Sequence, residues 1–277
     1  MSKPNRYFIK YYYIGSNRIY GSQRQPNLLT VEDILIQALI EKEYIEDVRS
    51  SQYEVASRTD KLVSARGAVF SFLTTKEPIL MEMNTALPKK VGVWAYCKVP
   101  NDFLSRYNAE TRHYKYVYPE PVSLMKKEGN LNLDKLIRAC KLLEGRHNFK
   151  NFHKRGKKET KTIRDMDEVR FIMEDDYLIF NFKSRAFLRQ QIRRMTRKLM
   201  QVAKETIEIH DLNFLLESDD YISYKPADPL GLILWDITYG ENVIFKEDPK
   251  SKDRMNSFFK QKEKKYGLKR KLFNILQ

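Results

Sequence analysis

The chain has 277 residues, of which 42% are hydrophobic, so it can bury the core of one large domain or of two ordinary ones. Its 51 lysines and arginines outnumber its 36 aspartates and glutamates, which gives a formal charge of +15. A field of this sign attracts phosphates, so nucleic acid is the leading class of partner and an anionic membrane is the competing one. The longest apolar stretches run only a few residues and the N-terminus shows no charged-then-apolar signal, so we expect a soluble, cytoplasmic protein with no membrane partner.

Residue types that commonly hold metals or nucleotides are sparse. The two cysteines, Cys97 and Cys140, are too few for a disulfide framework, and the histidines lack metal-ligand spacing with them or with each other. Glycine occurs 10 times, and no glycine-rich segment resembles a phosphate cradle or a dinucleotide fingerprint. We therefore expect neither a metal nor a small-molecule cofactor.

Strands and one long helix are predicted over the first part of the chain. The aromatic run 7–13 is typical of a strand, and further strands are predicted at 53–56, 68–73 and 91–99. Thr30 with Asp33 three residues on is typical of a capping box, and apolar spacing predicts a helix from there through about Tyr44. Residues 1–105 are therefore expected to form an α+β unit.

A second α+β unit is predicted over 106–247, with a separate basic segment over 248–277. Asn132 is expected to begin a helix that Gly145 closes as a C-cap. The segment 248–277 combines many lysines with a few apolar anchors, which favours a partly ordered basic helix able to touch RNA. The other predicted elements of the second unit are a strand at 113–118, a hairpin of strands 169–173 and 177–182, a basic helix at 186–204 and a final strand at 232–239.

The run 56–60 ends a β-prone segment and places Arg58 and Asp60 two residues apart in a loop. An acid held beside a cation stays ionised, so in a basic protein this pattern suggests a catalytic aspartate that acts on a polyanion. The alternative is an ordinary turn with a local ion pair.

Three further features carry cations or rings. In the strand 112–116, Arg112, Tyr114 and Tyr116 alternate with His113 and Lys115, so the rings are available either for stacking bases or for core packing. The helix 187–199 pairs an apolar stripe with a predicted cationic ridge, which would hold phosphates or a buried carboxylate, or would simply be solvated. The loop 153–161 is either a phosphate-gripping or a solubilising segment. The ridge consists of Arg189, Arg193 and Arg197, and the loop cations are Lys154, Arg155, Lys157 and Lys158.

Taken in order, five segments resemble the TruA-type tRNA pseudouridine synthases, and the resemblance runs from about residue 6 to about residue 240. The form Lys61-Leu62-Val63-Ser64 after the aspartate is closer to archaeal and eukaryotic relatives than to the bacterial Ala-Gly-Val-His, and Ser22 stands where bacterial members often have tryptophan. The matching segments are 20–25, 58–60 with 63–67, 112–116, 186–193, and Pro226-Ala227 with Gly231-Leu232.

The resemblance implies a fold of two ferredoxin-like (RRM-like) α+β halves. These would share an extended, mainly antiparallel sheet, with helices on one side and a basic catalytic cleft between the halves. It also implies a cofactor-free homodimer that isomerises uridine to pseudouridine in the anticodon arm of tRNA, in the region of positions 38–40.

Site roles follow from the same resemblance. Asp60 would be the catalytic carboxylate, Tyr114 would pack against the flipped base and help remove the C5 proton, and Arg193 would pair with Asp60. RNA contacts are expected from Arg58, Arg24, Arg66, Arg112, Lys154, Arg155, Lys157, Lys158, Arg189 and Arg197. The alternative function is that of a non-catalytic RNA-binding module or RNA chaperone that uses the same basic surface.

Overall fold

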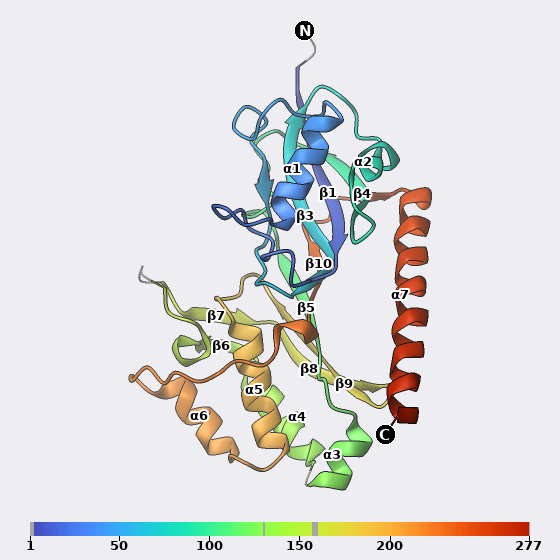
Figure 1. Cartoon of the computed structure of the whole chain (residues 1–277). Helices are drawn as coiled ribbons and strands as arrows, with labels where there is room; N and C mark the ends of the chain where they lie inside the picture. Colours follow the sequence, from blue (N-terminus) through green and yellow to red (C-terminus); the bar gives the residue numbers. More distant parts are fainter. Residues whose placement is uncertain (1–2, 130, 157–159, 277) are drawn as a thin grey trace. The chain divides into compact units, whose positions relative to one another are not determined.

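The computed structural model describes residues 3–129, 131–156 and 160–276, which divide into two compact units (Figure 1). Unit 1 comprises the chain up to Thr59, Ala65–Asn108 and the segment from Gly240 onward. Unit 2 comprises Asp60–Ser64 and Ala109–Tyr239. The segment from Gly240 thus groups with unit 1, whereas its composition predicts a separate basic segment over 248–277. Each unit mixes helices with antiparallel strands.

An antiparallel sheet forms the centre of unit 1, with strand order β11-β4-β1-β3 and β2 paired to β3. The central strand is buried from Arg6 to Tyr13, because it has a neighbour on each side and an apolar or aromatic side chain at most positions. The strands are β1 (Asn5–Tyr13), β2 (Glu54–Val55), β3 (Ser64–Thr74), β4 (Val91–Val99) and β11 (Lys246–Glu247). All four strands predicted for this part of the chain overlap β1 to β4.

The helices of unit 1 are α1 (Val31–Glu41), α2 (Leu80–Ala86) and α7 (Pro249–Leu276). The predicted capping box is confirmed, since the Thr30 side chain accepts from the Asp33 backbone and the Asp33 carboxylate accepts from that of Thr30. The helix ends at Glu41 rather than near Tyr44. The seven-residue α2 was not predicted, because it is too short to show a helical period.

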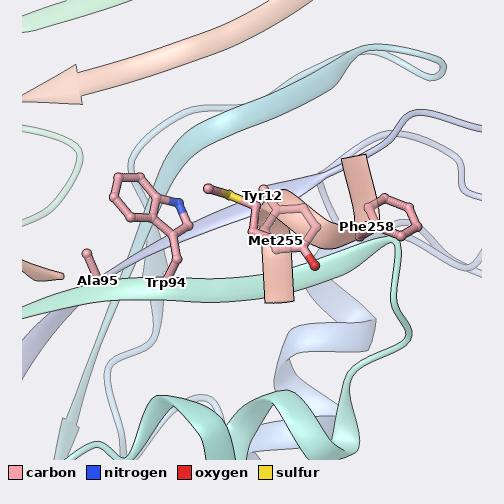
Figure 2. Packing of buried hydrophobic residues seen from close by; sticks show 5 residues of the cluster. All are labelled: Tyr12, Trp94, Ala95, Met255 and Phe258. Atoms are coloured by element: carbon pink, nitrogen blue, oxygen red, sulfur yellow. The ribbon is translucent and has the colours of Figure 1, made fainter. Parts of the chain in front are cut away.

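The first turns of α7 dock on the sheet of unit 1. Figure 2 shows Met255 and Phe258 beside Tyr12 of β1 and Trp94 of β4, and these side chains form one buried cluster. Arg254 donates to the Tyr12 hydroxyl at 2.9 Å and to the carbonyl oxygen of Leu87 at 3.1 Å. The helix is therefore anchored over its N-terminal half, while its last turns, from Glu263 to Leu276, are exposed.

In unit 2, four strands follow the antiparallel order β10-β5-β9-β8, and two short strands, β6 and β7, pair separately. The predicted hairpin is confirmed as β8 and β9, with Asp175 and Asp176 at positive φ in the turn, as type I′ hairpins require. The strands are β5 (Thr111–Val117), β6 (Gly145–Asn148), β7 (Ile163–Met166), β8 (Glu168–Glu174), β9 (Tyr177–Ser184) and β10 (Leu232–Thr238).

The helices of unit 2 are α3 (Val122–Glu128), α4 (Leu133–Leu142), α5 (Gln191–Ala203) and α6 (Ile209–Glu217), with 3₁₀ turns η1 (Lys150–Phe152) and η2 (Pro229–Gly231). Asn132 caps α4 as predicted, accepting from the Lys135 backbone at 2.9 Å. Gly145 is left-handed at φ +85° but begins β6, so the helix ends at Leu142 and the C-cap is Leu143.

The predicted start of the basic helix at Ala186 is wrong, because α5 begins only at Gln191. Gln190 is left-handed at φ +62°, which breaks the helical path just before it. Arg189 therefore lies outside the helix and cannot share a ridge with Arg193 and Arg197.

Among the described residues, no helix is long and apolar enough to span a membrane.

Candidate active site

Backbone and side-chain bonds within unit 1 secure the loop that leads to Asp60. The Thr59 backbone N–H donates to the Ser22 hydroxyl at 2.7 Å, and the Ser22 N–H donates to the Thr59 carbonyl oxygen at 3.2 Å. The hydroxyls of Tyr13 and Thr59 lie 2.6 Å apart. Ser22 is 2% exposed, so this two-way link is shielded from water. A small hydroxyl residue at position 22 thus orients the residue that precedes the aspartate.

Beyond Asp60, the chain turns sharply. The Val63 N–H donates to the Asp60 carbonyl oxygen at 3.3 Å, and Leu62 has φ +72°. This left-handed conformation costs an L-residue with a side chain about 1–2 kcal/mol, yet a leucine occupies it. The bacterial glycine at this position in the resemblance would adopt the same turn without strain. The turn after Asp60 therefore forms here with leucine in the left-handed position.

Asp60 and Arg193 form an ion pair within unit 2. Arg193 Nη1 lies 2.9 Å from Asp60 Oδ2, and Arg193 Nε donates to the Ala227 carbonyl oxygen at 2.8 Å. The Arg193 side chain is 10% exposed and that of Asp60 is 34% exposed. The Ala227 N–H donates back to the Arg193 carbonyl oxygen at 3.0 Å. Two acceptors therefore hold the guanidinium in one orientation, with its charge directed at a carboxylate that solvent can still reach.

Tyr114 lies on β5, between Leu234 of β10 and Phe182 of β9 in the strand register. The side chain is buried, and its ring contacts that of Phe187 edge to face at 5.2 Å between centroids. Tyr116, on the same face, donates its hydroxyl to the Asp228 carbonyl oxygen at 2.9 Å. Burial raises the pKa of Tyr116 to about 12, and nearby charges include Asp228, which raises the pKa, and Arg193, which lowers it. The residues 226–228 thus face both β5 and α5.

The predicted RNA-contacting cations of unit 1 have different surroundings. Arg58 is exposed, and Arg24 forms a 3.3 Å ion pair with Asp33. Burial raises the pKa of Glu32, an effect that Arg24 and Arg58 oppose. Arg66 lies over the Trp94 ring at 5.2 Å.

The predicted cations of unit 2 divide into buried and exposed groups. Arg112 is buried and donates to the carbonyl oxygen of Arg185, on the segment that leads from β9 to α5. Lys154, Arg155, Arg189 and Arg197 are exposed, and the Lys154 N–H donates to the Arg189 carbonyl oxygen at 2.9 Å. Lys157 and Lys158 lie outside the described residues.

The paired Asp60 and Arg193 side chains suit chemistry at an electrophilic carbon. An ionised carboxylate beside a guanidinium can attack an electrophilic carbon or stabilise positive charge developing on it. Within residues 3–129, 131–156 and 160–276, no three histidine, cysteine or acidic side chains group closely enough to hold a metal ion.

Comparison with known proteins identifies the family. A family model described as tRNA pseudouridine synthase matches residues 139–240, which include Arg193. The tRNA pseudouridine synthase A of Methanosphaera stadtmanae is 36% identical over 92% of this chain and 91% of its own length. The chain belongs to the TruA-type tRNA pseudouridine synthase family. Further TruA-type relatives of the same name occur in Methanothermobacter thermautotrophicus, 31% identical over 93% of this chain and 90% of the relative, and in Thermococcus sibiricus, 31% identical over 94% of both.

Two groups that position the TruA-type site give little functional signal in the sequence. Ser22 was noted only as a departure from the bacterial pattern, although its hydroxyl accepts from the Thr59 backbone. The Ala227 carbonyl acts through its backbone, so its side chain gives no chemical signal. The nearest signal was the Pro226-Ala227 pattern within the family resemblance.

Proposed function

We propose that this chain isomerises uridine to pseudouridine in tRNA, with Asp60 as the catalytic carboxylate. The observation that carries the proposal is the 2.9 Å pair of Asp60 and Arg193, because it joins the two segments that resemble the family's catalytic loop and its arginine helix. Membership of the tRNA pseudouridine synthase family supports the reaction and the substrate class.

The reaction rearranges bonds within one nucleotide. The N1–C1′ glycosidic bond breaks, a C5–C1′ bond forms, C5 loses its proton and N1 gains one, so no oxidant or co-reactant is consumed. Asp60 acts at C1′, either as a nucleophile or by stabilising the sugar as the glycosidic bond breaks. Arg193 holds the carboxylate in position through its 2.9 Å hydrogen bond. Tyr114 packs against the detached base and helps remove the C5 proton.

Reaching a paired base requires its extrusion, which costs a few kcal/mol that RNA contacts must offset. We assign these contacts to Arg58, Arg24, Arg66, Lys154, Arg155, Arg189 and Arg197 on the basis of their charge. Arg112 belongs to the same sequence-based set, although its burial and its bond to the Arg185 carbonyl favour a bracing role.

The finer features that the family resemblance implies complete the proposal. The target uridines lie in the anticodon arm, in the region of positions 38–40. The two units are ferredoxin-like halves with a shared sheet and a basic cleft. The enzyme acts as a cytoplasmic homodimer. Light scattering at working concentration tests the last point, and a monomer would contradict it.

The experiment that tests the function compares the wild-type protein with Asp60→Ala on tRNA, with pseudouridine measured by nucleoside analysis. Conversion by the wild-type protein without added nucleotide, together with its loss in the variant despite retained tRNA binding, supports an isomerase. A non-catalytic RNA-binding module or chaperone would leave nucleoside composition unchanged with either protein. Conversion by Asp60→Ala at the wild-type rate would overturn the role of the carboxylate.

A further inference from the structure

A tyrosine-bearing segment, 221–227, is attached to unit 2 along its length. The Ile222 N–H donates to Asn151 Oδ1 at 2.7 Å, and the Tyr221 hydroxyl donates to the His153 carbonyl oxygen at 3.0 Å. The ring of Tyr224 contacts that of Phe152 edge to face at 6.5 Å. Asn151 and Phe152 are fully buried, so the segment packs against the core of unit 2.

Three cations lie over the two tyrosine rings of this segment. The Arg155 guanidinium is 3.9 Å from the ring centre of Tyr221. The Lys198 ammonium and the Arg194 guanidinium, both on α5, are 4.5 Å and 5.1 Å from the ring centre of Tyr224. Each such contact stabilises the cation and restricts where its charge can lie.

None of these three cations, Arg155, Arg194 and Lys198, forms an ion pair with a carboxylate in the part of the chain that the structure describes. Burial lowers the pKa of Lys198, the neighbouring Arg197 lowers it further, and Asp211 opposes the shift. The cluster thus concentrates positive charge for which the described residues supply no ion-pair partner.

Arg194 lacks hydrogen-bond acceptors for part of its guanidinium within the described part of the chain. The residue is only 4% exposed, and its Nε and Nη1 groups have no hydrogen-bond acceptor among the described residues. An unpaired buried donor is destabilising, and a buried charge more so, unless an anion completes its surroundings. The preceding residue, Arg193, has both the Asp60 carboxylate and the Ala227 carbonyl. Arg194 therefore lacks the kind of partner that its neighbour has.

We propose that Arg155, Arg194 and Lys198, held on Tyr221 and Tyr224, form a binding site for the phosphodiester backbone of tRNA. The inference rests on the proposed function for the identity of the polyanion. Lys198 and Arg155 contact phosphate oxygens directly, while Arg194 adds a charge against the same ring as Lys198. Because Ala227, on the same segment, bonds to Arg193, the site positions the RNA relative to the catalytic pair.

The test measures the salt dependence of tRNA binding for Lys198→Gln, Arg155→Gln and the double variant. Each phosphate contact contributes a slope of about 0.7–0.9 in log Kd against log salt, so raising salt fourfold weakens binding about threefold per contact. When salt rises fourfold, the affinity of each single variant should therefore fall by a factor about threefold smaller than the factor for the wild-type protein. For the double variant, this factor should be about ninefold smaller than for the wild-type protein.

Two matched variants complete the design. Lys198→Arg keeps the charge and should keep the wild-type slope. Lys127→Gln removes an exposed charge on α3 of the same unit and should also keep it. Slopes equal to wild type in Lys198→Gln and Arg155→Gln would overturn the site, as would an equal fall in Lys127→Gln. The proposed function fails separately, if the wild-type protein binds tRNA but forms no pseudouridine.

Discussion

Replacing either member of the Asp60–Arg193 pair should separate catalysis from stability. Arg193→Met removes a charge-assisted hydrogen bond to Asp60, worth about 1.5–3 kcal/mol, and an ordinary one to the Ala227 carbonyl, worth about 1 kcal/mol. The Asp60 side chain is 34% exposed, so water can solvate it afterwards and the lower end applies, about 2.5 kcal/mol in total. At about 2–4 °C per kcal/mol, this lowers Tm by about 5–10 °C.

Asp60→Asn should have the opposite profile. Its amide oxygen still accepts from Arg193, so the loss of stability is about 1 kcal/mol or less. A neutral amide can neither attack C1′ nor stabilise positive charge there, so the rate should fall at least about 10³-fold, or about 4 kcal/mol in the barrier. Arg193→Met keeps the carboxylate but frees it to move, and a displacement of about 1 Å costs about 10²-fold.

Single-turnover release of tritium from C5 of labelled uridine in tRNA measures the rates, and thermal denaturation measures Tm. The control is Arg146→Met, which removes an exposed pair with Asp165 in the same unit and should change stability by about 0.5 kcal/mol or less. Asp60→Asn with a rate within tenfold of wild type would refute the catalytic role. Arg193→Met with wild-type Tm and rate would refute the positioning role.

Three further predictions concern Tyr114, Leu62 and a pair of glycines. Tyr114→Phe should fold normally yet react about 10²-fold more slowly in the tritium assay, whereas Tyr114→Ala should also lose about 3–5 kcal/mol of stability in denaturant titration. Leu62→Asn should raise stability by about 1 kcal/mol, since asparagine tolerates φ +72° better, and an unchanged Tm would contradict the strain. Gly92→Ala should cost about 1–3 kcal/mol, because its Cβ would meet three atoms at 2.5–2.9 Å. Gly267→Ala, in open space on α7, should gain about 0.5–1 kcal/mol, and equal responses of the two glycines would count against the packing.

The strands are predictable from the sequence where burial on both sides requires an unbroken run of apolar residues. β1 and β4 carry near-unbroken aromatic and β-branched runs, because each is flanked by strands on both sides. The short helices α2 and α3 were missed, since seven residues do not complete enough turns to show a period. The spacing of apolar residues does not reveal the left-handed backbone of Gln190. The sequence therefore predicts a start of α5 that is too early.

The candidate site was predictable only through the order of its motifs. Spacing alone predicts one cationic ridge of Arg189, Arg193 and Arg197, which is wrong because α5 starts after Arg189. What buries Arg193 is tertiary: the Asp60 carboxylate and the Ala227 carbonyl satisfy it from two other segments. A pattern of arginines four apart has no access to these acceptors.

Two consecutive buried arginines of α5, Arg193 and Arg194, have different surroundings. Arg193 and Arg194 project about 100° apart, since a helix turns once in about 3.6 residues. Arg193 has its carboxylate within the protein, whereas the Nε and Nη1 of Arg194 have no acceptor among the described residues. The segment 221–227 contacts both, through the Tyr224 ring and the Ala227 backbone. A phosphate bound by Lys198 and Arg155 beside Arg194 would thus be positioned, through the segment 221–227, relative to the carboxylate that Arg193 holds.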